Sequence, residues 1–367
     1  MGYVAAKGGE EAIQQAEKLF HALNGKVTRE FVESIRENMP YLVDRVMAEG
    51  SVYAPELAAL ALAQSGGDLY EAVLLLRAYR TTQPRIAYAE PVSQEQLLTV
   101  RRISAAFKDI PGGQILGPTL DYSHHILNVG LLDETNVSGE EEMDIAEEPA
   151  PRTYPPVTDW QRDQGLMAEL PAQDPVEAAD IPDVTRDAVA FPGPRAHRLQ
   201  ALARADTGGV LALGYASMRG YGLIHPTVNE LRLAYAEVEV KHPVTGAVFS
   251  AGRARVSQAE VVTQFGASSG HQFELGFAAT MGWNEVKTIA GSMLDMEMNS
   301  ANAHPAHTED FVLYHTEPVE SSGFCIHFKL PHYVTFASHL DSLRKVIETF
   351  YGGPKKQAAP QPEEVKS

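Results

Sequence analysis

PELAALALAQSGGDLYEAVLLLRAYRTT, residues 55–82, predicts two helices joined by a tight turn. Pro55 suits the first turn of a helix, because a proline there removes no intrahelical hydrogen bond. Gly66 and Gly67 suit the end of that helix, and the carboxylate of Asp68 can cap the next one. The stretch therefore predicts an antiparallel helix pair.

An amphipathic helix is predicted upstream of this pair. In EEAIQQAEKLFHAL, residues 10–23, apolar side chains recur at 3.6-residue spacing on one face, which needs a partner to pack against. Downstream, KDIPGGQILGP at 108–118 must be a loop, because glycine and proline interrupt its apolar residues. An apolar pattern resumes in LDYSHHILNVGLL at 120–132. We therefore expect residues 1–132 to form a helical domain.

The chain takes on a mixed character after residue 194. LRLAYAEVEV, residues 231–240, alternates apolar and polar residues as a half-exposed strand does. One or two strands are predicted at 248–265, further strands at 311–319 and 323–330, and helices at 283–298 and 338–350. The expected fold class is α+β, with a helical N-terminal half followed by a mixed sheet-and-helix C-terminal half over residues 195–350.

The segment between these halves, residues 133–194, is acidic and rich in proline, as in EEEMDIAEEPAPRTYPP at 140–156. A segment of this composition cannot bury enough apolar surface to order itself. It is predicted to be an insertion or linker with a short helix near residues 160–170. The end of the chain, residues 351–367, is predicted to be a disordered tail.

The composition indicates a globular protein of the cytoplasm. The 367 residues include no run of about 18 apolar residues that could span a membrane, and the N-terminus lacks a signal-peptide pattern. A formal net charge of -18 argues against a protein that coats nucleic acid, which needs a basic surface. The single cysteine, Cys325, excludes an internal disulfide and a four-cysteine metal site, and we expect it to pack as a small apolar residue.

HFKLPHYVTF, residues 327–336, places two histidines on either side of a proline. If His327 projects from a strand and Pro331 fixes a bend, His332 can swing back so that both imidazoles face one Zn²⁺ ion. Two histidines leave such a site open, so a third ligand would come from a distant residue, water or another subunit. The alternative is a pair of strand-end histidines with ordinary hydrogen bonds.

Two glycine-containing stretches could bind an anion. In RGYGLIHP, residues 219–226, Arg219 could form two hydrogen bonds to one phosphate while the glycines let backbone amides approach. In KGGEEAI, residues 7–13, Lys7 precedes a helix N-terminus, whose dipole favours phosphate, although the Walker spacing is missing. The alternative for both stretches is a plain turn with a surface cation.

A third stretch combines a cation, a carboxylate and an imidazole. KDIPGGQILGPTLDYSHH, residues 108–125, holds Lys108, Asp121 and His124 beside a flexible loop. The carboxylate and the imidazole could act as acid and base, or help to hold Mg²⁺. The alternative is a loop that leads into a packed helix.

Seven stretches carry a resemblance when taken together: YVAAKGGEEAI, VDRVMAEG, ELAALALAQSGGD, LLLRAYRTT, RRISAAFKDIPGGQILGPTLDYSH, LALGYASMRGYGLIHP and HFKLPHYV. They resemble the PhnI family, a subunit of the bacterial carbon–phosphorus lyase core complex, which degrades phosphonates. The resemblance runs from residue 3 to about residue 345, interrupted by the acidic segment, and it is specific because long strings match in order.

The resemblance implies a nucleosidase-type transfer. With its partner subunits, the family joins a phosphonate to C1 of the ribose of MgATP with loss of adenine, which gives ribose 1-phosphonate 5-triphosphate. Alone, such subunits hydrolyse purine nucleoside triphosphates to the free base and ribose triphosphate. The implied partners are the other core subunits, including the radical-SAM lyase subunit, together with ATP or GTP, an alkylphosphonate and further copies of the chain. Neither nucleic acid nor a membrane is expected as a partner.

This chemistry assigns roles to the candidate residues. The reaction passes through an oxocarbenium-like centre, so it needs charge stabilisation, a proton for the departing purine and a clamp for the triphosphate. Under the resemblance the phosphate contacts are Lys7, Lys108 and Arg219, the acid–base or magnesium pair is Asp121 and His124, and the proton donor to the purine is His225. The resemblance also implies that His327 and His332 bind Zn²⁺ at the border with the radical-SAM subunit. Because His125 follows His124, either imidazole of that doublet could act.

Two other classes of function stay open on the sequence. A non-catalytic scaffold subunit could position its neighbours in the complex and contribute a metal site at the interface with the radical-SAM subunit. A metal-dependent hydrolase could use His327 and His332 directly. Release of adenine from ATP by the purified chain separates an enzyme from a scaffold, and chelator-insensitive activity would count against the hydrolase.

Overall fold

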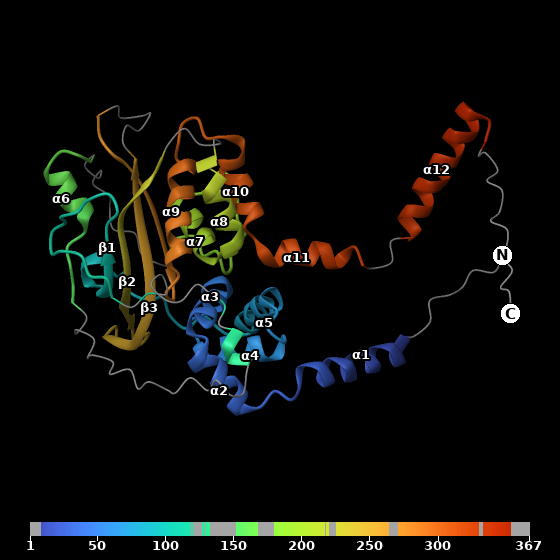
Figure 1. The fold of residues 1–367 in the computed structure, drawn as a ribbon, viewed down its shortest axis with the longest axis horizontal. Coiled ribbons are helices and arrows are strands. Elements are labelled where there is room, and N and C mark those ends of the chain that lie inside the picture. The colour runs from blue at the N-terminus through green and yellow to red at the C-terminus, as the bar shows by residue number, and fades with distance from the viewer. Residues whose placement is uncertain are drawn as a thin grey trace. The chain divides into compact units, whose positions relative to one another are not determined.

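A computed structural model gives the fold of the protein. The structure describes residues 9–117, 119, 127, 129–132, 152–167, 180–216, 218–219, 225–263, 271–329 and 333–353. The chain divides into two compact units, Met1–Val319 and Glu320–Ser367. Within the described residues, helices combine with a four-stranded antiparallel sheet (Figure 1). The predicted α+β class is therefore confirmed.

The N-terminal part of the first unit is helical, as predicted. Its helices are α1 (Gly9–Asn24), α2 (Arg29–Asn38), α3 (Pro40–Gly50), α4 (Pro55–Gln64) and α5 (Leu69–Thr81). The predicted helix pair is α4 and α5. Asp68 caps α5 by accepting hydrogen bonds from the amides of Tyr70 (2.9 Å) and Glu71 (3.1 Å). Gly66 and Gly67 have φ values of 63° and 87°, a conformation that favours glycine at a helix end.

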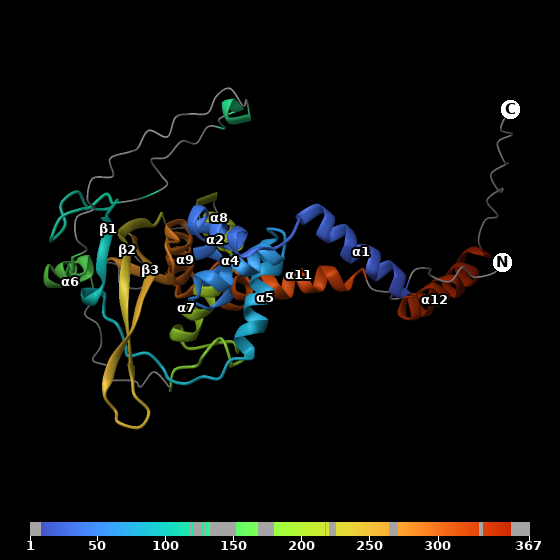
Figure 2. The same ribbon diagram turned by 90° about the horizontal axis from the view of Figure 1, so that it is seen from below.

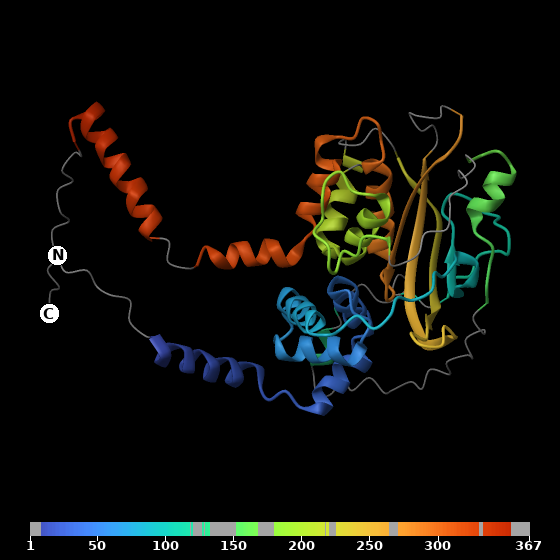
Figure 3. The same ribbon diagram turned by 180° about the vertical axis from the view of Figure 1, so that it is seen from behind.

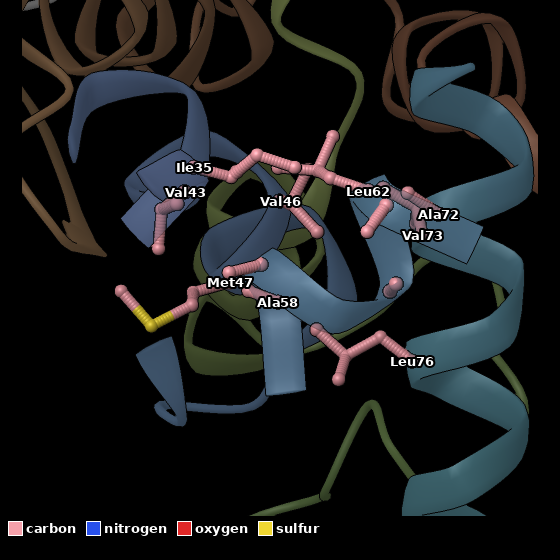
Figure 4. Close-up of a cluster of buried hydrophobic side chains, with 12 residues drawn as sticks. Ile35, Val43, Val46, Met47, Ala58, Leu62, Ala72, Val73 and Leu76 are labelled. Carbon is pink, nitrogen blue, oxygen red and sulfur yellow. The ribbon is translucent and has the colours of Figure 1, made fainter. Parts of the chain in front are cut away.

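Helices α2 to α5 bury an apolar cluster between them. Val46, Met47, Leu62 and Leu76 are at most 2% exposed, and Figure 4 shows them converging from α3, α4 and α5. Full burial of a side chain of this size contributes about 1.5–3 kcal/mol. Helix α1 differs, because none of its residues is buried and its Leu23 is 76% exposed.

The sheet is a simple antiparallel series. It contains β1 (Leu98–Ile103), β2 (Thr227–Lys241), β3 (Val248–Thr263) and β4 (Glu274–Met281), in that order. The long strands β2 and β3 form a hairpin whose tip extends beyond the neighbouring strands (Figure 2). The register sets Arg102 opposite Arg232 and Glu230 opposite Glu260. Side chains directly opposite each other are close enough to interact, so this register brings four charged side chains together in the middle of the sheet.

Helices lie on both sides of the sheet. Helix α9 (Glu285–Met298) packs against β3 and β4, and α7 (Arg195–Arg204) and α8 (Thr207–Ala216) lie behind it, whereas α6 (Val157–Asp163) lies on the other side (Figures 1 and 3). The contact between α9 and β4 is very close. A Cβ atom on Gly276 of β4 would lie 2.0 Å from the carbonyl oxygen of Ser292, so only glycine fits there.

Parts of the segment predicted as an insertion pack into the first unit. Helix α6 lies close to the helix predicted near residues 160–170. Val157, at its start, is buried, and so is Val184 further along the chain. The domain boundaries that we place at residues 132, 194 and 350 stay predictions.

Two of the predicted strands are wrong. Residues 311–319 and 323–330 fall largely in helices α10 (Glu309–His315) and α11 (Pro318–His327). Short apolar runs fit a strand or a buried helix equally well, and here Pro318 begins a helix while Glu309 lies in the first turn of another. The strand β1 is a second correction, because it interrupts the first 132 residues, which we predict to be helical.

The second unit contains most of α11 and the whole of α12 (Tyr333–Tyr351). Helix α12 confirms the closing helix predicted at 338–350. Large apolar side chains on both helices are exposed, among them Phe324 (61%), Phe336 (72%) and Phe350 (76%). In the part of the chain that the structure describes, no helix is both long enough and apolar enough to cross a bilayer.

Candidate functional site

Half of the predicted site residues can be placed in the structure. Lys7, Asp121, His124 and His332 lie outside the described residues. Lys108, Arg219, His225 and His327 are described, and all four are exposed. The roles predicted for all eight residues stay predictions.

Lys108 lies on a loop that other side chains hold in place. The amide group of Gln114 donates a hydrogen bond to the carbonyl oxygen of Lys108 (2.9 Å). The guanidinium group of Arg102 donates to the carbonyl oxygens of Pro111 (2.6 Å) and Gly113 (2.9 Å). The glycine turn therefore has a defined shape, and Lys108 extends from it toward solvent.

The anchor of this loop is a pair of neighbouring arginines on β1. Their side chains point to opposite faces of the sheet, because side chains alternate along a strand. Arg101 forms an ion pair with Glu285 at the start of α9, and Arg102 forms one with Glu230 of β2. Both arginine side chains are at most 1% exposed. Buried charges persist in folded proteins only when they are paired, so these contacts fix β1 and the loop after it.

Glu230 is the centre of this buried network. Its Oε1 atom accepts hydrogen bonds from the Nε atoms of Arg102 and Arg232 (2.9 Å for Arg232), and its Oε2 atom accepts one from the amide of Val157 (3.1 Å). Both arginines also donate to the carbonyl oxygen of Pro155, at 3.0 Å each. One carboxylate thus joins β1, β2 and the start of α6.

Glu260 lies beside Glu230 in the same patch. Its two carboxylate oxygens accept hydrogen bonds from the side-chain amides of Gln94 (2.9 Å) and Asn229 (3.2 Å). Burial raises the pKa of Glu260 to about 7, and the neighbouring charge of Glu230 acts in the same direction, against those hydrogen bonds. The patch lines neither of the two cavities of the first unit described here, and its hydrogen bonds connect the sheet with the segments around it.

A cleft lies beside the C-terminal end of α5. It consists of two adjoining cavities of about 540 Å³ and 810 Å³, which share the lining residues Ser51, Arg85 and Thr185. Both volumes fall in the range of about 300–1,000 Å³ that is common for small-molecule sites. The walls come from the N-terminal helices, the sheet and residues 181–186.

The first cavity, here called the apolar recess, is lined mainly by carbon. Tyr88, Val184, Val256 and Met281 contribute to its walls. Gln200 holds one wall in place, because its side chain accepts a hydrogen bond from the amide of Val184 (3.1 Å) and donates to a neighbouring carbonyl. The recess therefore offers a flat ligand apolar contacts on several sides.

The second cavity, here called the arginine groove, is lined by Arg80, Arg85 and Arg186. Arg85 pairs with Asp183 at 2.7 Å, and its guanidinium group lies 5.2 Å from the centre of the Tyr88 ring. Partial burial opposes a low pKa for Asp183, but hydrogen bonds from Thr185 and the charges of the two nearby arginines lower it. Asp183 is thus a carboxylate held in its charged form.

The predicted phosphate contacts are not part of this cleft. Arg219 lies just beyond α8, and its guanidinium group is 4.8 Å from the ring centre of Tyr215. His225 comes just before β2. Neither of these residues, nor Lys108, lines the apolar recess or the arginine groove. Their convergence on one triphosphate stays a prediction.

His327 is the last residue of α11, so the strand that we predict around it is wrong. Cys325 is exposed, which also corrects the expected packing of its side chain. In the described part of the chain, no group of three or more histidine, cysteine, aspartate or glutamate residues is arranged to hold a metal ion. The zinc site predicted for His327 and His332 stays a prediction.

The cleft could not be recognised in the sequence, because its walls come from distant stretches. One signal was present in RAYRTTQPR, residues 77–85, where three arginines occur within nine residues at a helix end. The other walls, residues 181–186 and the strands β3 and β4, meet this stretch only in the folded chain.

The comparisons with known proteins agree with one another over nearly the whole chain. The profile of the family described as "Bacterial phosphonate metabolism protein (PhnI)" matches residues 2–350. HtxH of Stutzerimonas stutzeri is 42% identical, over 98% of this chain and 100% of its own. The alpha-D-ribose 1-methylphosphonate 5-triphosphate synthase subunits PhnI of Rhizobium meliloti and Escherichia coli are 42% and 38% identical, over 94% of this chain and 94% and 98% of their own. The resemblance is confirmed, and this chain belongs to the PhnI family of bacterial phosphonate metabolism proteins.

Proposed function

We propose that this chain is a subunit of a carbon–phosphorus lyase core complex and takes part in a nucleosidase-type transfer. In this reaction a phosphonate displaces adenine from C1 of the ribose of MgATP and gives ribose 1-phosphonate 5-triphosphate. The observation that carries the proposal is the similarity over 94% of the chain to two proteins named as subunits of the synthase of that methylphosphonate product.

The product in that name defines what the site must do. It carries a phosphonate on C1 and a triphosphate on C5 of one ribose, so the synthase must hold a ribose 5-triphosphate while the bond at C1 is exchanged. The C1–N9 bond breaks as the phosphonate oxygen bonds to C1, and the departing adenine takes up a proton. Charge develops at the sugar in between, so fixed groups that stabilise it lower the barrier most.

The residues that carry these roles are proposed from the family resemblance. Phosphate contacts are proposed for Lys7, Lys108 and Arg219, an acid–base or magnesium pair for Asp121 and His124, and proton donation to the purine for His225. Histidine is the residue that most often transfers protons in enzymes, and the exposed side chain of His225 is open to a ligand. Mg²⁺ would arrive bound to ATP.

The test is the release of adenine from MgATP, followed by chromatography. We expect the purified chain to release adenine and ribose triphosphate, and we expect the assembled complex with methylphosphonate to form the 1-phosphonate instead. If no adenine appears under either condition, the transfer proposal is wrong.

A zinc site is proposed at His327 and His332, completed by the radical-SAM subunit. When bound, zinc would join the two chains and supply no step of the transfer itself. Replacing both histidines by alanine should remove one zinc ion per copy of this chain from the assembled complex, measured by elemental analysis. Zinc content equal to that of the unchanged complex would contradict the ligand assignment.

A scaffold role is the second candidate, and the exposed apolar side chains favour it. Leu23 on α1, Phe336 and Phe350 on α12 and Phe324 on α11 are each more than half exposed. Apolar surface of this kind marks contact with other chains, either partner subunits or a second copy. A pure scaffold would leave adenine release unchanged when it is withdrawn from the assembled mixture, whereas the enzyme proposal expects the release to stop.

A further inference from the structure

The arginine groove concentrates positive charge in an acidic protein. The chain has 30 lysines and arginines against 48 acidic residues. Yet the cleft is lined by Arg80, Arg85, Arg186 and Arg204, and among the described residues that line it Asp183 is the only carboxylate. A concave surface lined by one sign of charge attracts ligands of the opposite sign. The expected ligand is therefore an anion with several charges.

Among the arginines of the groove, Arg80 is the one that a bound anion would stabilise most. It lies half-buried at the end of α5, and its Nη1 atom donates to the carbonyl oxygen of Gly50 (3.1 Å). Among the described residues, no carboxylate lies within ion-pair distance of it. A guanidinium group has five N–H donors, so most of those on Arg80 are available. Burial lowers the pKa of Arg80, and the charges of Arg204 and Arg77 lower it further, whereas the charge of Asp183 acts in the opposite direction.

The two arginines next to Arg80 in the interior already interact with a carboxylate of the protein. Arg77 pairs with Glu317 at 2.5 Å, and Arg204 reaches the same carboxylate at 3.5 Å. Their charges add to the positive field at Arg80 without offering it a partner. Without a bound anion, the positive charges near Arg80 repel one another. A bound phosphate would offset this repulsion.

The two outer arginines can join Arg80. The side chain of Arg85 is 39% exposed in its pair with Asp183, whose own side chain is 15% exposed. Because Arg85 is partly open to solvent, it has N–H donors left for a phosphate beside Asp183. Arg186 is an exposed residue of the same groove, and among the described residues it has no ion pair. One guanidinium group can donate two hydrogen bonds to the oxygens of one phosphate group, so three arginines suit a chain of phosphates.

The apolar recess begins where the arginine groove ends. Arg85 and Thr185 belong to both cavities, so a molecule that occupies both passes these residues. The recess offers the ring of Tyr88 and the side chains of Val184 and Met281, which suit a flat aromatic base. A ligand with a charged chain at one end and an aromatic ring at the other fits this cleft.

We propose that Arg80, Arg85 and Arg186 bind the 5′-triphosphate of a nucleoside triphosphate whose base lies in the apolar recess. The assignment rests on the proposed function, which requires a ribose 5-triphosphate, and it gives the triphosphate other partners than Lys7, Lys108 and Arg219.

The test measures how strongly ATP, adenosine and inorganic tripolyphosphate compete with a fluorescent ATP derivative for the chain purified with its partner subunits. We expect Arg80→Ala to weaken the binding of ATP and of tripolyphosphate at least tenfold, because it removes charged hydrogen bonds. Adenosine binding should change less than twofold. Arg80→Lys should recover part of the loss for ATP. The matched control is Arg253→Ala, which removes an exposed arginine from the β2–β3 hairpin and should leave all three affinities unchanged.

Arg186→Ala guards against a folding defect, because its side chain is exposed. This variant should lower the affinity for ATP about threefold or more, while the thermal unfolding temperature stays the same. Equal ATP affinity in wild type, Arg80→Ala and Arg186→Ala would overturn the assignment.

The same mixtures separate this inference from the proposed function. If adenine is released and both arginine variants release it at the wild-type rate and with the wild-type Michaelis constant, the function stands and the assignment fails. If Arg80→Ala weakens ATP but no enzyme mixture releases adenine, the binding site stands and the proposed reaction fails.

Discussion

Replacing Glu230 by glutamine is expected to lower the free energy of unfolding by about 3–5 kcal/mol, the loss typical of a broken buried ion pair. The carboxylate faces Arg102 and Arg232, and none of these three side chains has measurable exposure. Removing its charge leaves two guanidinium groups buried beside Glu260, whose raised pKa leaves it only partly charged near pH 7. Chemical denaturation of the purified chain, followed by circular dichroism, measures the change.

The control for this prediction lies on the same strand. Glu237 of β2 forms an ion pair with Arg253 at 2.9 Å, but its side chain is 40% exposed. Glu237→Gln makes the same chemical change and should leave the unfolding midpoint almost unchanged, because water replaces the lost partner. If the two variants unfold at similar denaturant concentrations, the buried network does not stabilise the sheet in the way described.

The second large effect is expected from Gly276→Ala. The new methyl group would lie 2.0 Å from the carbonyl oxygen of Ser292 and 2.7 Å from Cβ of Met296. Both neighbours belong to α9, whose backbone must move away from β4 to make room. We expect a loss of about 3 kcal/mol, at the upper end for overpacked cores, and a lower unfolding temperature in calorimetry.

Gly291→Ala provides the comparison, since this glycine lies on the α9 side of the same contact. A Cβ atom there would meet only Cβ of Ala278, at 3.1 Å, which a small shift relieves. Replacing glycine by alanine within a helix gains up to about 1 kcal/mol, so the net change should be close to zero. A loss as large for Gly291→Ala as for Gly276→Ala would mean that substitution itself, and not the close approach to Ser292, destabilises the fold.

The helical elements follow from local signals in the sequence. Asp68 and Gly66 mark the boundary between α4 and α5 through capping and backbone conformation, both of which act within a few residues. In the segments at 311–319 and 323–330 the one contrary local signal was Pro318, which suits a helix start better than a strand. Their apolar runs are as compatible with a helix as with a strand, and packing around Val312 and Leu313 decides for the helix in the first of them.

The buried charges and the cleft could not be predicted from neighbouring residues. Arg102, Glu230 and Arg232 look like surface residues in the sequence, because charged side chains are seldom buried. Only the strand register shows that they face one another. Likewise Arg80 and Arg186 are more than 100 positions apart, and no spacing rule connects them. The family could be recognised from long matching strings, which do not depend on knowing any of these contacts.

The grip of Arg102 on the carbonyl oxygens of Pro111 and Gly113 has a consequence for molecular recognition. A free glycine turn samples many backbone conformations, and a partner that selects one of them loses affinity by that selection. In this protein, folding itself fixes one conformation of the glycine turn. Whatever molecule meets Lys108 finds a rigid platform, so its contacts there translate into binding strength with little entropic loss.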